Sequence, residues 1–534
     1  MGRTPDLEIA VHRPVGASLV QDYLSGTDGA QPFYGARFDT FAAFEAKAIE
    51  VDGRFDRQAR ERAAAAMIAP DGADPERLRA FVEEGGYVVT TGQQPGLFGG
   101  PLYSIHKGLT AVRLAETLER RLGRPVIPLF WVASDDHDWA EANHTHLVGL
   151  DNELHRIELD GAGESVTPPL HRIPMGSGVE ACLKEFLACL PDTDFSPEFV
   201  DLLRASFVSE ATLPEAYHRT LRHLLGRFGL YFTDAAHPVV KEVSGPTLLG
   251  ELTAAERMEE TLATTAQQLH EAGYALQVPI MEGGVNLFLE GPAGRERLYS
   301  EGGGYRLRTS GQLLSADEIR ERFEHDPAVL SPNVLLRPVV ESVVFPTLAY
   351  VGGPGEMAYF GQIAAYFAAH GIGMPIVFPR WAAMPVEAKV RKVLDKFDLE
   401  PDRLQQPFHE LAGEIARDGT PPEVRAALGK LRGAVAQGVS ELQSVTTPVD
   451  PTLKGPVQHV RSQAFAALDE LERKVTQAVK RESEIALNQL EKARVHLFPE
   501  GKPAERVHSP FYFLARYGSG FLDALYERFE IDLR

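Results

Sequence analysis

Two polar clusters in the chain have the residue types and spacing for chemistry on an anionic or activated group. The first lies in TTGQQPGLFGGPLYSIHKG, residues 90–108, which holds five glycines around a histidine and a lysine, four of them ahead of the pair. Glycine lets backbone N–H groups approach an anion, and a helix N-terminus adds partial positive charge. We expect an anion-binding cradle made by the backbone of 92–100 and by the side chains Gln93, Gln94, His106 and Lys107. The alternative is a tight strand–helix connection whose glycines serve only packing, since the segment matches neither a Walker A nor a GxGxxG pattern.

The second cluster is Asp135-Asp136-His137-Asp138, followed by Glu141, His144 and His146. Carboxylates and imidazoles at the end of a strand suit binding of hydroxyl groups, of a substrate amine or of a divalent metal. The HEXXH pattern is missing and every ligand lies in one short stretch, so we expect no bound metal. The remaining alternative is an acidic first helical turn, where the helix dipole favours aspartate.

Three further residues or turns are weaker candidates. Arg337 lies within NVLLRPVVE, which we interpret as strand-like, and a buried arginine needs either a carboxylate of the fold or a bound anion. GGPGEMAYFGQ, residues 352–362, is a second glycine turn before a helix, with Gly353, Glu356 and Tyr359 placed to meet a ligand. Arg380 follows a Pro-bounded strand, and a structural role is equally open for it. No GxSxG elbow occurs, which disfavours covalent catalysis.

The elements that position these residues follow from hydrophobic pattern and glycine punctuation. The region 37–83 reads as helical, GYVVTTG as a buried strand, 104–122 as a helix ended by Gly123, and RPVIPLFWV as a second strand. Strand, helix and strand form a right-handed βαβ unit with a parallel sheet. Ligands bind at the carboxyl ends of such strands, where both clusters lie.

The domain organisation is predicted from changes in hydrophobic pattern and charge along the 534 residues. Further strand signals lie in 331–351, and GIGMPIVFPRW gives one that ends at Arg380. Beyond 384 the chain turns to long charged helices whose apolar residues keep a 3–4 spacing, a coiled-coil pattern. We predict a first half-core (1–150), an inserted region (151–330), a second half-core (331–383), a helical coiled-coil domain (384–505) and a segment packing back on the core (506–534).

Bulk composition narrows the class of protein. The net charge of −21 weighs against nucleic acid or an anionic membrane as the main partner. No apolar run approaches the ~20 residues that span a bilayer, and the start of the chain lacks the apolar core of a secretory signal. The two cysteines, Cys182 and Cys189, fit one helix face better than a disulfide. We therefore expect a cytoplasmic protein.

Four segments together, TTGQQPGLFGGPLYSIHKG, FWVASDDHDWAEANH, SPNVLLRPVVESVVFPTLAYVGGPGE and PIVFPR, resemble the bacillithiol-biosynthesis cysteine-adding enzyme family (BshC). The closing SPFYFLARYG and the coiled-coil-like region also match. The resemblance implies an α/β fold: a nucleotidylyltransferase-like Rossmann core with inserted connecting-peptide elements and a C-terminal α-helical coiled coil that mediates homodimerisation.

The resemblance also implies a reaction. Cysteine is joined through an amide to the amine of glucosaminyl malate, and because amide formation needs an activated carboxylate, ATP with Mg²⁺ is the expected energy source. Related synthetase-like cores carry a His-x-Gly-His motif. Here His106-Lys107-Gly108 matches its first part and Leu109 replaces the second histidine, which leaves adenylation and phosphorylation of the carboxylate both open.

Mapped onto this sequence, the resemblance gives catalytic and binding sets with no metal ligand. The catalytic set is His106, Lys107, Asp135, Asp136 and His137, with one Asp as a candidate general base. The binding set is Thr91, Gly92, Gln93, Gln94, Gly96, Gly100, Tyr103, Ser104, Asn333, Arg337, Gly353, Glu356 and Arg380. Two other functions stay open: a metal-dependent hydrolase using the 135–146 cluster, and a nucleotide-binding coiled-coil scaffold without turnover.

Overall fold

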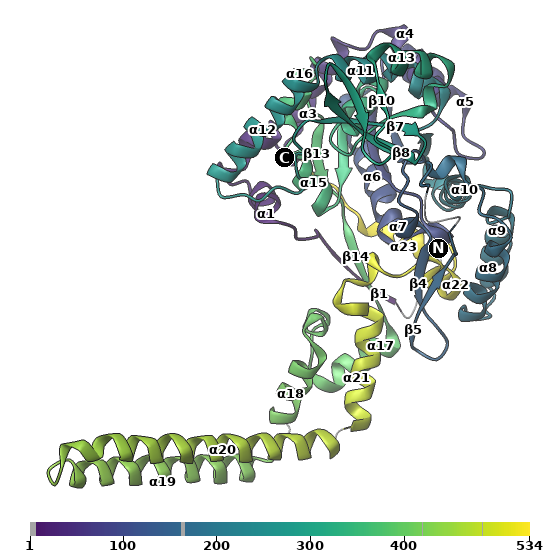
Figure 1. The fold of residues 1–534 in the computed structure, drawn as a ribbon. Helices are drawn as coiled ribbons and strands as arrows, with labels where there is room; N and C mark the ends of the chain where they lie inside the picture. Colours follow the sequence, from purple (N-terminus) through teal and green to yellow (C-terminus); the bar gives the residue numbers. More distant parts are fainter. Residues whose placement is uncertain (1–6, 162–165, 419, 483) are drawn as a thin grey trace. The chain divides into compact units, whose positions relative to one another are not determined.

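The computed structural model describes residues 7–161, 166–418, 420–482 and 484–534. These fall into two compact units, one formed by Met1–Pro385 with Glu505–Arg534 and the other by Val386–Ala504. Figure 1 shows the elements of both units along the chain. Each unit is described separately below.

A five-stranded parallel sheet lies at the centre of the first unit, in the order β13-β12-β2-β3-β6. Its strands are β2 (Tyr87–Gln93), β3 (Val126–Val132), β6 (Tyr231–Asp234), β12 (Thr347–Gly352) and β13 (Ile376–Pro379). Every residue of β3, β12 and β13 is buried, as expected for a parallel sheet covered on both faces. The sequence prediction of a parallel Rossmann-like sheet is confirmed.

The predicted βαβ unit is present around β2 and β3. Helix α6 (Tyr103–Leu122) connects them, and Gly123 ends it in the left-handed conformation with φ 67°. The apolar residues of the helix lie against the sheet, and its first five residues after Tyr103 are all buried. The carboxyl end of β2 and the start of α6 therefore hold Gln93 and Lys107 at one edge of the sheet.

A second, antiparallel sheet has the order β10-β9-β8-β7-β11. Its strands are β7 (Gly284–Gly291), β8 (Gly294–Glu301), β9 (Gly304–Leu307), β10 (Leu313–Leu314) and β11 (Leu330–Pro332), and a separate hairpin pairs β4 (His144–Val148) with β5 (Leu154–Glu158). The region 151–330 also supplies β6 to the central sheet. It is therefore not an insertion throughout, because its middle part completes the core.

Helices cover both sheets of the first unit. The region 37–83, predicted as helical, forms α3, α4 and α5. The remaining helices and the first strand are given with them here: β1 (Leu7–His12), α1 (Ser18–Ser25), α2 (Gln31–Tyr34), α3 (Phe41–Asp52), α4 (Arg57–Ala65), α5 (Pro75–Glu83), α7 (Trp139–Ala142), α8 (Gly178–Cys189), α9 (Ser196–Ser206), α10 (Leu213–Leu225), α11 (Pro238–Thr253), α12 (Ala255–Glu271), α13 (Ala316–His325), α14 (Arg337–Val344), α15 (Pro354–Phe360), α16 (Ala364–Ala369), α22 (Phe511–Tyr517) and α23 (Gly520–Arg528).

The prediction of a strand around Arg337 is wrong, because this residue begins helix α14. The valines that follow it favour strands by propensity, yet Val339, Val340 and Val344 are buried on a helix that is enclosed on most of its sides. Pro338 sits in the first turn, where its missing N–H costs nothing. Local packing therefore overrides the β-branched composition.

The second unit is helical. Following β14 (Ala382–Glu387), it contains α17 (Ala388–Phe397), α18 (Phe408–Asp418), α19 (Pro422–Thr446), α20 (Lys454–Glu482) and α21 (Glu484–Leu497). Helices α19 and α20 lie side by side as a long hairpin (Figure 1). The sequence prediction of a C-terminal coiled coil is confirmed. In the described parts of the chain, no helix has the length and apolar character needed to cross a membrane.

We predict that Gly96→Ala destabilises the fold. A Cβ at this position would lie 2.7 Å from the Cα of Gly100, which is backbone and cannot rotate away. The expected loss in the free energy of unfolding is about 1–3 kcal/mol, measured by urea denaturation. Gly250→Ala is the control, because its Cβ would meet nothing within 4 Å on an exposed helix position. Equal stability of the Gly96 variant and the wild type would contradict the close approach.

Candidate functional site

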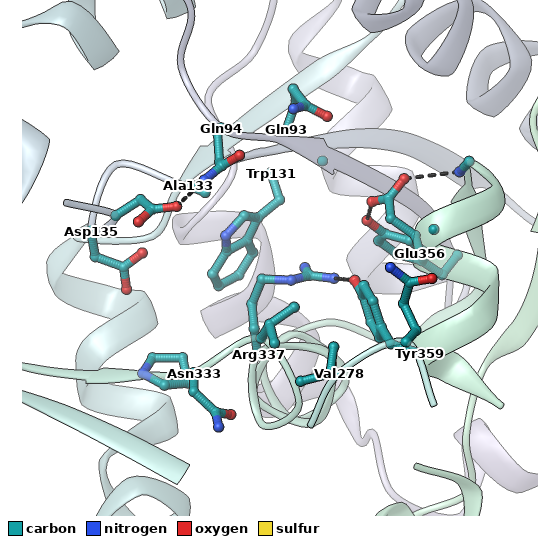
Figure 2. A pocket seen from close by; sticks show the side chains of 18 of the residues that line it. Gln93, Gln94, Trp131, Ala133, Asp135, Val278, Asn333, Arg337, Glu356 and Tyr359 are labelled. Atoms are coloured by element: carbon teal, nitrogen blue, oxygen red, sulfur yellow. Dashed lines mark hydrogen bonds between the residues drawn. The ribbon is translucent and has the colours of Figure 1, made fainter. Parts of the chain in front are cut away.

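A cavity of about 610 Å³ lies at the carboxyl ends of the central strands. Figure 2 shows side chains from several elements converging on it. Thirteen of the predicted residues line it: Gly92, Gln93, Gln94, Tyr103, Lys107, Asp135, Asp136, His137, Asn333, Arg337, Gly353, Glu356 and Arg380. The structure thus brings both sequence clusters, the second glycine turn and the two arginines to one site.

The charges that line the cavity are mainly positive. Its cations are Lys107, Arg295, Arg297, Arg337, Arg380 and Arg506, and its carboxylates are Asp135, Asp136 and Glu356. This excess stands out in a chain whose net charge is −21. A basic cavity walled by low-dielectric protein attracts small anions while the acidic surface repels polyanions.

Lys107 is held by three acceptors from two segments, the end of β2 and the start of α15. Its ammonium donates to the Gly92 carbonyl at 2.8 Å and to the Gln93 side-chain oxygen at 2.9 Å, and pairs with Glu356 at 2.5 Å. An ammonium has three N–H donors, so all of them are engaged. Lys107 therefore fixes the positions of Gln93 and Glu356 at the cavity rather than reaching for a ligand.

Glu356 is the carboxylate partner of Lys107. It also accepts hydrogen bonds from the Tyr350 hydroxyl and from the Gly353 N–H, the latter at 2.9 Å. Burial opposes ionisation of this carboxyl, but the Lys107 charge and these hydrogen bonds outweigh it and lower its pKa. Burial lowers the pKa of Lys107, and Glu356 offsets part of that effect.

Asp136 is a second organised carboxylate. The Gln94 amide donates to one oxygen, the His137 N–H donates to the other at 2.7 Å, and Arg295 lies 3.9 Å away. Burial would raise the pKa of Asp136, yet the contacts with His137, the Arg295 charge and the Gln94 amide hold it well below its usual value. A carboxylate so firmly ionised is a weak base and a strong anchor for an ammonium or a hydroxyl group.

The neighbouring Asp135 is paired with a residue outside the cavity lining. Lys241 of α11, itself buried, lies 3.4 Å from an Asp135 oxygen and donates to the Leu330 carbonyl at 3.1 Å. The two aspartates therefore have different environments. Asp136 meets an arginine and amides, whereas Asp135 meets a buried ammonium.

Arg337 extends across the cavity toward Tyr359, as Figure 2 shows. Its guanidinium donates to Glu341 at 2.6 Å and to the Tyr359 hydroxyl at 3.4 Å, and lies 5.0 Å from the ring centre of Tyr350. The sequence leaves open whether Arg337 pairs with a carboxylate of the fold or with a bound anion, and in the structure its carboxylate partner is Glu341. Only part of the guanidinium fork is used by these contacts, because an arginine has five donors.

Five predicted residues lie outside the cavity lining: Thr91, Gly96, Gly100, Ser104 and His106. Thr91 donates to the Val351 carbonyl at 2.8 Å across the sheet, and Ser104 is buried. Gly96 and Gly100 approach each other closely, so the packing alternative for these glycines agrees with the structure. The predicted cradle is limited to the backbone and side chains of 92–94.

His106 lies behind the cavity wall. It is fully buried, and its Nδ1 lies 2.9 Å from Glu505. Glu505 also accepts two hydrogen bonds from Arg380, at 2.6 and 3.1 Å, and both partners are buried. His106 therefore contacts the cavity only through Glu505 and Arg380, which corrects the direct contact expected from the sequence.

The sequence reading missed several lining residues. The most polar of them is Arg295 on β8, whose guanidinium donates to Ser331 at 2.8 Å, to the Pro332 carbonyl at 2.9 Å and to His137 Nδ1 at 3.0 Å. Since a guanidinium only donates, His137 accepts at Nδ1. The others with side-chain chemistry are Trp131, Gln277, Phe288, Arg297, Tyr350 and Arg506. In the sequence, Arg295 is one arginine in a strand of alternating residues, and no local motif marks it as a residue of the site.

The histidines and acids of 135–146 do not converge on one point. Asp138 caps α7 by accepting from the Glu141 N–H at 3.0 Å, and His144 Nδ1 lies 3.0 Å from the Ala140 carbonyl. Within the described residues, no three His, Cys, Asp or Glu side chains are grouped to hold a metal ion.

The protein is of the α/β class. It has a parallel Rossmann-like sheet with a basic cavity at the carboxyl ends of its strands, and the same chain continues into a helical coiled coil. A family model described as "Bacillithiol biosynthesis BshC, N-terminal Rossmann-like domain" matches residues 7–381. A second, "Bacillithiol biosynthesis BshC, C-terminal coiled-coil domain", matches residues 383–532. The chain belongs to the BshC family of bacillithiol biosynthesis, and the resemblance inferred from its motifs is confirmed.

Three curated relatives are similar to this chain over 82–98% of its length. The protein from Salinibacter ruber is 30% identical over 97% of this chain and 96% of its own. The protein from Koribacter versatilis is 30% identical over 98% and 97%, and that from Prosthecochloris aestuarii is 31% identical over 82% and 80%. Each carries the name "Putative cysteine ligase BshC".

We predict that Glu505→Gln destabilises the first unit by about 3–5 kcal/mol at pH 7, because it leaves the buried Arg380 without its counter-charge. Burial opposes ionisation of Glu505, but Arg380 and His106 hold its pKa well below its usual value. Its stabilising effect is therefore present above the unfolded pKa of ~4.3 and is lost as the pH falls toward the lower folded pKa.

The measurement is urea denaturation of both proteins at pH 7 and at several values below pH 4. The difference between wild type and variant should shrink on acidification. Glu61→Gln is the control, because Glu61 forms an exposed pair with Arg57 and its loss should leave stability nearly unchanged. A difference that is constant down to the acid limit would contradict the buried ion pair.

Proposed function

We propose that this chain is a cysteine ligase that joins the carboxyl group of cysteine to the amine of glucosaminyl malate, which yields bacillithiol. Family membership and the printed name of the relatives support the reaction class. The structural observation that carries the proposal is the basic cavity at the carboxyl ends of the parallel strands.

The charge of the cavity fits the charge of these substrates. Glucosaminyl malate presents two carboxylates, and an activated carboxyl group carries a phosphate or a nucleotide. Arginine forks match carboxylate and phosphate oxygens in pairs. Arg337, Arg297 and Arg506 reach the cavity from three different segments and can meet separate anionic groups of the bound substrates.

The acidic side of the cavity fits the attacking amine. In the reaction the amine nitrogen forms a bond to the cysteine carboxyl carbon, the bond from that carbon to its activated oxygen breaks, and the amine loses a proton. Asp136 is ionised and oriented by Gln94 and Arg295, so we assign it to hold the amine or the sugar hydroxyls. The positive residues nearby favour the negative charge that develops on the carboxyl oxygen.

We also propose ATP with Mg²⁺ as the source of activation. ATP would supply a leaving group on the cysteine carboxylate, and the cationic lining fits a polyphosphate. The residues that would hold it are the cavity arginines together with Gln93, whose amide nitrogen donates to the Tyr103 hydroxyl at 3.0 Å.

The test of the proposed function is a mass-spectrometric thiol profile of cells with and without this gene. Deletion should abolish bacillithiol and cause glucosaminyl malate to accumulate. Unchanged bacillithiol, in cells shown to make it, would overturn the proposal.

The same cells test the role of Asp136. Complementation with Asp136→Asn should restore less than about a tenth of the bacillithiol, because the amide keeps the shape and loses the charge that holds the substrate. Asp138→Asn is the matched control, because Asp138 is exposed and only caps α7. Full thiol output from the Asp136 variant would refute the assignment.

We further propose that two copies associate through the α19–α20 hairpin. Leu431, Leu442 and Val445 are exposed on α19, and Val460 and Leu471 on α20. Leu431 and Leu442 are 11 residues apart, as are Val460 and Leu471, so each pair lies on one stripe of its helix, and Val445 lies one turn from Leu442. Apolar stripes of this kind pair in coiled coils. A second copy presents the same stripe by symmetry.

Leu442→Glu should convert the dimer into a monomer, measured by analytical ultracentrifugation. Burying a carboxylate in the stripe costs more than the contact gains. Ser440→Glu adds the same charge to another face of α19 and should leave the dimer intact. A wild-type chain that sediments as a monomer would refute the pairing.

A further inference from the structure

A fully buried carboxylate, Glu251 of α11, lies outside the cavity lining and outside the chemistry assigned above. One of its oxygens accepts a hydrogen bond from the Asn286 amide at 2.9 Å. The other lies 3.3 Å from Nε2 of His370, which follows α16. A buried carboxylate is costly unless it is compensated, so its contacts show what it organises.

From Glu251 a chain of side-chain amides leads to the cavity. The Asn286 oxygen accepts a hydrogen bond from the Asn333 amide at 2.8 Å, and the Asn333 N–H donates to the Asn286 carbonyl at 2.9 Å. The Asn333 side-chain oxygen then accepts from the N–H groups of Leu335 and Leu336, both at 3.0 Å. These two amides precede α14 and have no partner within the helix ladder.

The orientation of the two asparagine amides is determined at both ends of this hydrogen-bonded row. A carboxylate only accepts, so the NH₂ of Asn286 must face Glu251 and its oxygen must face Asn333. Backbone N–H groups only donate, so the oxygen of Asn333 must face α14 and its NH₂ must face Asn286. Both requirements give the same orientation. Reversing either amide would place donor against donor at the start of α14 or at Asn286.

The start of α14 determines where Arg337 lies. Arg337 is the first residue of the helix, and its N–H donates to the Asn333 carbonyl at 2.9 Å. Its guanidinium crosses the cavity toward Tyr359 (Figure 2). Asn333 also lines the cavity, but both ends of its side chain are engaged in the amide chain, so it acts as a cap rather than as a ligand for substrate.

We propose that Glu251 is a positioning residue that holds Arg337 in its binding position through Asn286 and Asn333. The link from Arg337 to substrate rests on the proposed function, whereas the link from Glu251 to the start of α14 does not.

The first test measures hydrogen exchange of the full-length chain without ligand. In Glu251→Gln, the new NH₂ group can face Asn286, which would turn the side-chain amides of Asn286 and Asn333 around. The Leu335 and Leu336 N–H groups would then lose their acceptor and should exchange about tenfold faster, as expected for loss of a cap. Glu296→Gln is the matched control. Glu296 is also a buried carboxylate of the first unit, but it accepts from the backbone N–H groups of Ala293, Thr309 and Ser310 and from the Ser310 side chain, away from the amide chain. It should leave exchange at 335–336 unchanged.

The second test measures the affinity for glucosaminyl malate by calorimetry in a double-mutant cycle. Glu251→Gln should weaken binding about tenfold. Arg337→Lys keeps a charge beside Glu341 and removes the guanidinium fork. If Glu251 acts through Arg337, the double variant should bind no more weakly than Arg337→Lys alone.

The outcomes separate the two proposals. Unchanged exchange at 335–336 in Glu251→Gln would overturn the amide chain, and additive losses of affinity would overturn the positioning of Arg337. A wild-type chain that fails to bind glucosaminyl malate would refute the proposed function, and the exchange measurement would still decide the role of Glu251 at α14.

Discussion

The site depends on one buried ammonium. Lys107 has three N–H donors and meets three acceptors, which come from the end of β2 and from the start of α15. Because β2 and β12 are neighbours in the sheet, this contact joins the two strand ends where the chain reverses its direction of winding. A Rossmann-like sheet opens a crevice at such a point, and here the crevice is held at fixed width by an ion pair.

The remaining walls come from segments far apart in the chain. The β7–β8 hairpin supplies Arg295, the loop before α14 supplies Asn333, and the segment after the helical unit supplies Arg506. Each is fixed from behind by buried polar contacts rather than by apolar packing alone. Such networks cost stability if they are incomplete, and when complete they define one geometry. The excess of cations in the cavity is maintained because most of them already have a carboxylate or carbonyl partner.

Much of the fold was predictable because local pattern and tertiary structure agree. The strands of the central sheet are short apolar runs bounded by glycine or proline, and α6 has helical periodicity with a glycine stop. The prediction failed at α14, where valines have strand propensity but pack as a helix. Glycines gave an ambiguous signal, since Gly92 borders the cavity while Gly96 and Gly100 serve close packing. Arg295 has no local signature, because its role exists only once β8 lies beside His137.

The order of synthesis has a consequence for the first unit. The chain completes the sheet by Pro379, leaves the unit at Val386, and re-enters it only at Glu505. A ribosome adds about 5–20 residues per second, so Arg380 exists for on the order of ten seconds before the carboxylate of Glu505 is made, and His106 is made earlier still. During that interval the nascent sheet carries a cation that it cannot yet bury. The wall of the cavity is therefore completed only after the helical hairpin has been made.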